Sequence, residues 1–180
     1  GSNTMAAPIF LVGFMGSGKS TIGRHLADAL GYRFVDTDVF IETRFRKRIL
    51  DMFAQHGEAT FRRRERMVIE ELMSMPDTVF ATGGGLPCYE DTMELLLQSG
   101  SVVYLSCSPT VLAARLELCK RTRPTIKDKS GEELFAFVTD MLQVRAPIYR
   151  RAHHICPIDE VDTPQKEYRF AQELASLLTR

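Results

Sequence analysis

Residues 13–20 combine the residue types that bind phosphate groups. Their sequence, GFMGSGKS, fits the pattern GxxxxGK[ST] at every fixed position. The glycines let the backbone wrap around an anion, so that several N–H groups converge on it. The lysine can neutralise charge on the β- and γ-phosphates, and the serine hydroxyl can bind Mg²⁺. The segment therefore predicts a site for ATP and Mg²⁺, but it does not identify the phosphate acceptor. The residues expected to contact the nucleotide here are Gly16, Ser17, Gly18, Lys19, Ser20 and Thr21.

Two aspartates, Asp36 and Asp38, follow the short apolar run Phe34-Val35. Ligands of open parallel sheets bind beyond the carboxyl ends of the strands, so both carboxylates can approach the phosphate-binding loop. Alternate residues of an extended segment point the same way, which suits two carboxylates with separate tasks. Asp36 could hold Mg²⁺ through water, while Asp38 takes or orients the proton of the acceptor hydroxyl. The structural alternative for an aspartate here is a helix N-cap.

The third apolar run, residues 78–82, ends without the carboxylate that binds Mg²⁺ in many P-loop proteins. Asp36 is therefore the candidate for that task. The run continues into Gly83-Gly84-Gly85. Three glycines allow a backbone to approach a ligand closely and to present N–H groups, although they also suit an ordinary turn.

Arginines cluster in residues 44–48 and 62–66. On a helix, Arg62 and Arg66 share a face that Arg64 does not, so we expect most of these arginines on a solvated surface, balanced by glutamates that include Glu65. Arginine also suits bidentate capture of a carboxylate, so a buried member of the cluster could bind an anionic acceptor.

Two further arginines lie near the expected nucleotide. Arg123 falls in the polar segment 121–131, which suits a lid that closes over phosphates and excludes water. Arg115 could stack on an adenine ring. The alternative for each is an ordinary surface arginine.

The elements that position these residues alternate along the chain. Strand-like runs at residues 9–12, 34–35, 78–82, 101–106 and 154–156 predict an α/β fold with a parallel sheet. Helical patterns cover residues 21–30, 39–53 with a break near Arg48, 59–73, 89–97, 109–118, 132–149 and 164–178. We expect one domain over residues 5–180, and an expression tag at residues 1–4.

The composition restricts the class of protein. The 180 residues are 44% hydrophobic and carry a formal net charge of zero, so no global field draws the chain to nucleic acid or to a membrane. The four cysteines form no CxxC pair, which predicts reduced thiols and a cytoplasmic location. The apolar runs are too short to span a bilayer.

In order along the chain, the segments GFMGSGKSTIG, FVDTD, GEATFRRRE, TGGG, RP in the expected lid and RAPIYRR resemble the shikimate kinase family. The resemblance implies phosphoryl transfer from ATP to the 3-hydroxyl of shikimate, in aromatic amino-acid biosynthesis. It implies a P-loop kinase fold with a five-stranded parallel sheet in the order 2-3-1-4-5. It also implies a substrate-binding segment at residues 38–73 and a lid at residues 121–131. The partner would be a small-molecule substrate, and we expect a monomer.

The same resemblance implies a role for each site residue. Asp38 would bind the ring hydroxyls and help to activate the nucleophile. Lys19 and Arg123 would stabilise the transferring phosphoryl group. Arg62 and Arg145 would bind the carboxylate of shikimate, and Gly83, Gly84 and Gly85 would contact the substrate. Ser20 and Asp36 would bind magnesium. Arg115 would contact the adenine.

Two segments depart from the family pattern. Thr125-Ile126-Lys127 follows Arg123-Pro124 where leucines are usual, and residues 156–162 show no recognisable adenine contact. The alternatives are another small-metabolite kinase, for gluconate or a nucleoside monophosphate, and a non-catalytic nucleotide-binding module.

Overall fold

The computed structural model describes residues 5–180, and the predicted tag at residues 1–4 lies outside the described residues. Five parallel strands form one sheet in the order β2-β3-β1-β4-β5, which confirms the predicted order. The strands are β1 (Ile9–Val12), β2 (Arg33–Asp36), β3 (Thr78–Ala81), β4 (Ser101–Ser106) and β5 (His154–Pro157).

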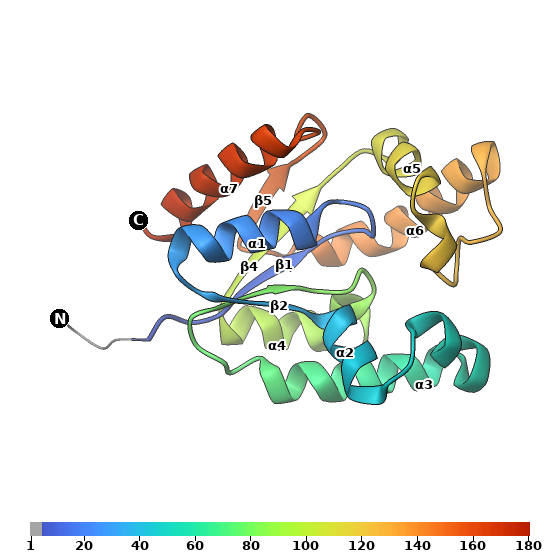
Figure 1. Ribbon diagram of the computed structural model, residues 1–180, viewed down its shortest axis with the longest axis horizontal. Coiled ribbons are helices and arrows are strands. Elements are labelled where there is room, and N and C mark those ends of the chain that lie inside the picture. The colour runs from blue at the N-terminus through green and yellow to red at the C-terminus, as the bar shows by residue number, and fades with distance from the viewer. Residues whose placement is uncertain (1–4) are drawn as a thin grey trace.

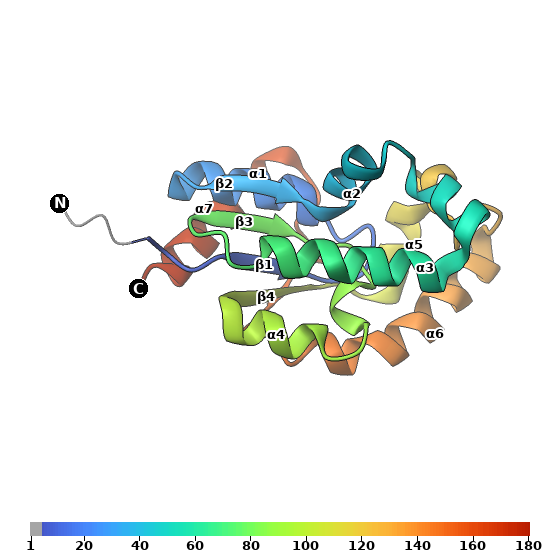
Figure 2. The same ribbon diagram turned by 90° about the horizontal axis from the view of Figure 1, so that it is seen from below.

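Helices cover both faces of this sheet. On one face α1 (Lys19–Leu30) packs beside α7 (Pro164–Leu178), and on the other lie α3 (Ile49–Leu72), α4 (Thr92–Ser99) and the end of α6 (Gly131–Tyr149) (Figures 1 and 2). The remaining helices are α2 (Thr37–Phe45), α5 (Pro109–Glu117) and the short 3₁₀ helices η1 (Leu86–Cys88) and η2 (Lys120–Thr122). No helix within residues 5–180 has the length and apolar character needed to cross a membrane.

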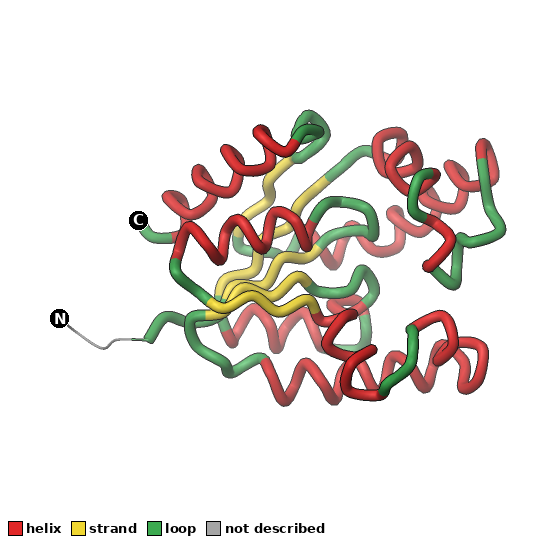
Figure 3. Tube along the Cα trace, in the orientation of Figure 1, coloured by secondary structure: helices red, strands yellow, loops and turns green. Residues whose placement is uncertain are grey.

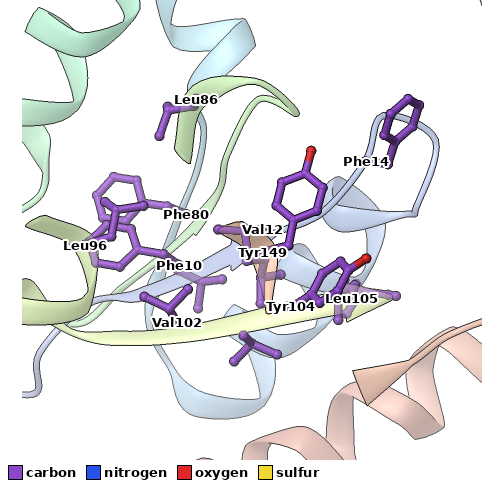
Figure 4. Packing of buried hydrophobic residues seen from close by; sticks show 14 of the residues in the cluster. Phe10, Val12, Phe14, Phe80, Leu86, Leu96, Val102, Tyr104, Leu105 and Tyr149 are labelled. Atoms are coloured by element: carbon purple, nitrogen blue, oxygen red, sulfur yellow. The ribbon is translucent and has the colours of Figure 1, made fainter. Parts of the chain in front are cut away.

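The inner strands are buried on both faces, which explains their continuous apolar sequences. Every residue of β1 and β3 is buried, whereas the edge strands β2 and β5 are partly exposed. Phe10 and Phe80 are paired in the sheet, and their rings stack with centroids 5.2 Å apart (Figure 4). The strands end together at one edge of the sheet, where connecting loops follow them (Figure 3). This edge is where a parallel sheet of this kind binds ligands.

Most predicted boundaries agree with the structure. Gly31 ends α1 in a left-handed conformation, and the predicted break near Arg48 separates α2 from α3. Gly57 interrupts α3 with φ 81° and ψ 168°, a conformation that is essentially restricted to glycine. Helices α1 and α2 each begin two residues before their predicted starts, and the largest error is at α4, which begins at Thr92 instead of Tyr89. The reason is that residues 86–88 form η1, and Glu90 has a positive φ of 46° that a helix does not allow.

Candidate active site

A cavity of about 690 Å³ lies at the carboxyl edge of the sheet. Its lining includes the phosphate-binding loop that follows β1, the end of β2 and the glycines that follow β3. Arg115 is the one predicted site residue outside the lining. The predicted site residues that line the cavity are Gly16, Ser17, Gly18, Lys19, Ser20, Thr21, Asp36, Asp38, Arg62, Gly83, Gly84, Gly85, Arg123 and Arg145.

The phosphate-binding loop connects β1 to the N-terminus of α1. Gly16 and Gly18 have φ values of 82° and 87°, which the absence of a side chain permits. The buried Lys19 donates hydrogen bonds from Nζ to the carbonyl oxygens of Gly13 and Phe14. The pKa of Lys19 is lowered to about 7, mainly by burial, and the charge of Arg123 acts in the same direction. A bound polyphosphate would favour the charged form of this lysine, because opposite charges stabilise each other.

Ser20 and Asp36 meet beside this loop. The Ser20 hydroxyl donates to Oδ2 of Asp36 at 2.5 Å, while Oδ1 of Asp36 accepts from the backbone N–H of Val39 and caps α2. Asp36 therefore caps α2 and also lies beside the P-loop serine, while its binding of Mg²⁺ stays a prediction. One hydroxyl and one carboxylate suit Mg²⁺, which takes most of its ligands from water and substrate phosphates. The pair fits the predicted magnesium site.

Asp38 lies in the first turn of α2, so the prediction of an extended segment through residues 36–38 was wrong. The N-cap at Asp36 starts the helix one residue after β2 ends, and the helix turns Asp38 toward the cavity. A Cβ atom placed on Gly83 would lie 2.7 Å from Oδ1 of Asp38 and 2.8 Å from Oε2 of Glu65. Burial raises the pKa of Asp38, and the charge of Asp36 acts in the same direction.

The other two glycines lie against arginines. A Cβ atom on Gly84 would lie 3.3 Å from Nη1 of Arg145, and one on Gly85 would lie 2.5 Å from Cζ of Arg62. None of the three glycines is among the positive-φ residues of the described chain. Their lack of a side chain therefore matters here because it leaves room for charged groups. Each glycine borders a different part of the candidate acceptor site.

Glu65 is a site residue that the sequence prediction missed. It was expected on a solvated surface, but it is only 1% exposed and pairs through Oε1 with Nη1 of Arg62 at 2.9 Å. A signal was present, because Glu65 lies on the apolar stripe of α3: Phe61 lies four residues before it, and Val68 and Leu72 lie three and seven residues after it. Its Oε2 is buried and has no hydrogen-bond partner among the described residues.

The replacement Glu65→Gln is expected to change how stability depends on pH. Burial raises the pKa of Glu65 from 4.5 to about 7, although Arg62 opposes the shift. The folded protein therefore binds one more proton than the unfolded chain between these values, and its stability falls as pH rises through them. Relative to the unmodified protein, Glu65→Gln should gain on the order of 3 kcal/mol between pH 4.5 and pH 8.

Urea unfolding at several pH values measures this difference. Glu70→Gln, at an exposed position of the same helix, is the control for the loss of one carboxylate. A difference between Glu65→Gln and the unmodified protein that stays constant with pH would contradict the expectation.

Arg145 and Arg123, the latter in the segment predicted to form a lid, both line the cavity. Nε of Arg123 and Nη1 of Arg145 are buried without a hydrogen-bond partner in the described part of the chain. Buried polar atoms of this kind are costly unless a ligand satisfies them. Ile126, which replaces the usual leucine pattern of the lid, is fully buried and packs in the core.

Arg115 instead contacts the segment after β5, within residues 156–162, where the sequence showed no recognisable adenine contact. Its Nη2 donates to the carbonyl oxygens of Ile158 and Val161, each at 3.2 Å. Asp159 in the same segment accepts a hydrogen bond from the backbone N–H of Ser108. Arg115 therefore holds the loop after β5 to α5, and its expected contact with adenine stays a prediction.

This fold and site define a P-loop kinase. A phosphate-binding loop with its lysine and serine lies in the same cavity as Asp38, Arg62 and Arg145. The first group suits a nucleotide polyphosphate, and the second suits a small acceptor that carries hydroxyl and carboxylate groups.

Comparison with known proteins identifies the family. The shikimate kinase family model matches residues 15–178, and the chain belongs to this family. The shikimate kinase of Parabacteroides distasonis is 42% identical over 170 residues, which cover 94% of this chain and 98% of that protein. Family membership makes the chain an enzyme that uses ATP as phosphoryl donor.

Two solved structures are similar to this one. The crystal structure of shikimate kinase from Bacteroides thetaiotaomicron has a TM-score of 0.92 and 38% identity, and covers 98% of this chain and 100% of that chain. Shikimate kinase from Acinetobacter baumannii, in complex with shikimate, has a TM-score of 0.85 and 36% identity. The match covers 97% of this chain and 93% of that chain.

Proposed function

We propose that this chain transfers the γ-phosphoryl group of ATP to the 3-hydroxyl of shikimate, in aromatic amino-acid biosynthesis. The observation that carries the proposal is the set of charged groups around the three glycines. Asp38 borders Gly83, Arg145 borders Gly84 and Arg62 borders Gly85, all in one cavity with the phosphate-binding loop. A relative that is 36% identical was solved in complex with shikimate, which supports this acceptor.

The proposed reaction assigns the two arginines to the carboxylate of shikimate. Arg62 and Arg145 can each donate two hydrogen bonds to it, and this would orient the ring. Asp38 would then accept the proton of the 3-hydroxyl as its oxygen bonds to the γ-phosphorus. The bond from that phosphorus to the β–γ bridging oxygen breaks, and ADP leaves. The raised pKa of Asp38 favours proton acceptance.

Lys19 and Arg123 are proposed to stabilise the charge of the transferring phosphoryl group. Both line the cavity, and Nε of Arg123 is buried without a partner among residues 5–180. Ser20 and Asp36 would hold Mg²⁺, which supplies positive charge at the β- and γ-phosphates. The substrate-binding segment at residues 38–73, the lid at residues 121–131, the cytoplasmic location, the monomeric state and the absence of nucleic-acid or membrane partners stay predictions.

An assay of ADP release with a panel of acceptors tests the proposed function. Shikimate should support turnover, whereas gluconate, nucleoside monophosphates and water alone should not. Turnover with gluconate or a nucleotide, but not with shikimate, would show that shikimate is not the acceptor. No turnover with any acceptor, despite measurable ATP binding, would favour the non-catalytic module.

The replacement Arg62→Ala is expected to weaken shikimate binding about 10- to 100-fold, because it removes a charge-assisted pair worth roughly 1.5–3 kcal/mol. Titration with shikimate measures the affinity, and ATP affinity should change little. Arg63→Ala is the matched control, because Arg63 is the exposed neighbour on the same helix and donates to Thr60. Equal shikimate affinities for the two variants would remove Arg62 from the acceptor site.

A further inference from the structure

The glycine loop that borders the acceptor site is held by hydroxyl groups on two sides. The N–H of Gly83 donates to Oγ1 of Thr37 at 3.0 Å, at the start of α2. The hydroxyl of Tyr149 donates to the carbonyl oxygen of Gly84 at 2.6 Å, from the end of α6. These two bonds connect the loop to the elements that carry Asp38 and Arg145.

Tyr149 lies in a buried environment, which strengthens this hydrogen bond. Its side chain is fully buried, and its ring packs on that of Tyr104 with centroids 5.1 Å apart (Figure 4). Burial raises the pKa of Tyr149 above its ordinary value, so the hydroxyl keeps its proton and stays a donor. No other described residue donates a hydrogen bond to the carbonyl oxygen of Gly84. A hydrogen bond in such surroundings is stronger than one in water.

The same helix carries Arg145, four residues before Tyr149, so the two side chains lie on one face. Nη1 of Arg145 lies 3.3 Å from the position of a Cβ atom on Gly84, and its Cζ lies 5.7 Å from the centre of the Phe14 ring. Gly84 therefore lies close to Arg145 and also accepts a hydrogen bond from Tyr149. Any movement of the Gly84 backbone away from α6 would break the Tyr149 bond and widen the gap to Arg145.

We propose that Tyr149 is a positioning residue for the acceptor. Its hydroxyl holds the Gly84 backbone against α6, so that Arg145 and the glycine loop meet the substrate carboxylate as one preformed surface. The proposal rests on the proposed function, and it adds a residue that touches neither substrate. Loss of the hydroxyl should loosen the arginine side of the acceptor site and leave the nucleotide side intact.

Tyr149→Phe removes only the hydroxyl, and Tyr104→Phe is its matched control. Both changes remove one hydroxyl from the same pair of packed rings, but only Tyr149 bonds to the glycine loop. The KM for shikimate of Tyr149→Phe should rise about 5- to 10-fold, as expected for one lost hydrogen bond. Its KM for ATP and its kcat should change less than twofold, and Tyr104→Phe should keep the shikimate KM of the unmodified protein.

A double-mutant cycle with Arg145→Ala tests whether Tyr149 acts through the arginine. If it does, Tyr149→Phe should have little further effect on shikimate binding once Arg145 is replaced, because the two effects are coupled. Independent effects that multiply would overturn the proposal. So would an unchanged shikimate KM in Tyr149→Phe, an equal rise in the KM values for shikimate and ATP, or a Tyr149→Phe protein that does not fold while Tyr104→Phe does.

Turnover of shikimate by the unmodified protein distinguishes failure of this proposal from failure of the proposed function. If that protein does not turn over shikimate, the proposed function fails and the role of Tyr149 fails with it. If it turns over shikimate and only the Tyr149→Phe result differs from expectation, the proposed function stands and the positioning role alone is rejected.

Discussion

Replacement of Asp38 by asparagine is expected to lower the turnover of shikimate about 10²- to 10⁴-fold, the usual effect of losing a general base. Asparagine has nearly the same shape as aspartate but cannot accept the proton of the 3-hydroxyl. The effect should fall on kcat, because the proposed role of Asp38 is to accept the proton during the reaction; its half-buried side chain lies beside Gly83. Steady-state kinetics with shikimate, together with ATP titration, measure both properties.

Asp28→Asn is the control for this variant, since Asp28 is exposed on α1 and its replacement removes the same charge. That variant should keep full turnover. If Asp38→Asn turned over shikimate at the rate of the unmodified protein, Asp38 would have no role in proton transfer. A loss confined to ATP binding would instead assign Asp38 to the nucleotide.

The second large effect is expected for Lys19→Met, which should lower kcat about 10²- to 10³-fold by analogy with the loss of one preorganised donor at a developing charge. Lys19 is buried, and its Nζ is already held within the loop by the carbonyl oxygens of Gly13 and Phe14. Methionine has a similar length and keeps the packing but supplies no charge. Because this charge serves the phosphoryl group and not the acceptor, any acceptor that supports turnover should be affected equally.

Lys166→Met is the matched control, because Lys166 is exposed on α7 and pairs with Asp162. It should leave kcat unchanged. A Lys19→Met protein with normal kcat, or one that loses shikimate affinity while its turnover rate is kept, would contradict the assignment of Lys19 to the phosphoryl group.

Local patterns were sufficient for most of the fold. The buried strands have continuous apolar sequences, and the helices next to them have recognisable ends, such as Ser108 before Pro109 in α5 and Gly31 after α1. These signals depend on neighbouring residues in the chain, so the sequence contains them directly. The start of α4 was wrong because residues 86–88 form η1 and Glu90 has a positive φ, and no local pattern marks that conformation.

In the candidate site, too, local sequence marks some residues, whereas others are set by contacts between distant segments. The phosphate-binding loop is one continuous segment, so its lysine, serine and glycines were predictable together. Glu65 was misplaced because the arginines around it suggested a solvated surface, whereas helical packing buries it beside Arg62. Thr37 and Tyr149 were missed as site residues because their hydrogen bonds reach residues 46 and 65 positions away in the chain.

The sequence by itself determined the nucleotide loop, the parallel sheet and its order through the family resemblance, and the types of charged residue that surround the acceptor. Only the tertiary structure decided which charged group meets which glycine, that Asp36 both caps α2 and accepts from Ser20, and that Arg115 lies outside the cavity. The physical reason is that these contacts join segments that are distant in the chain. Their geometry depends on how helices pack at the edge of the sheet, and local propensity does not encode that packing.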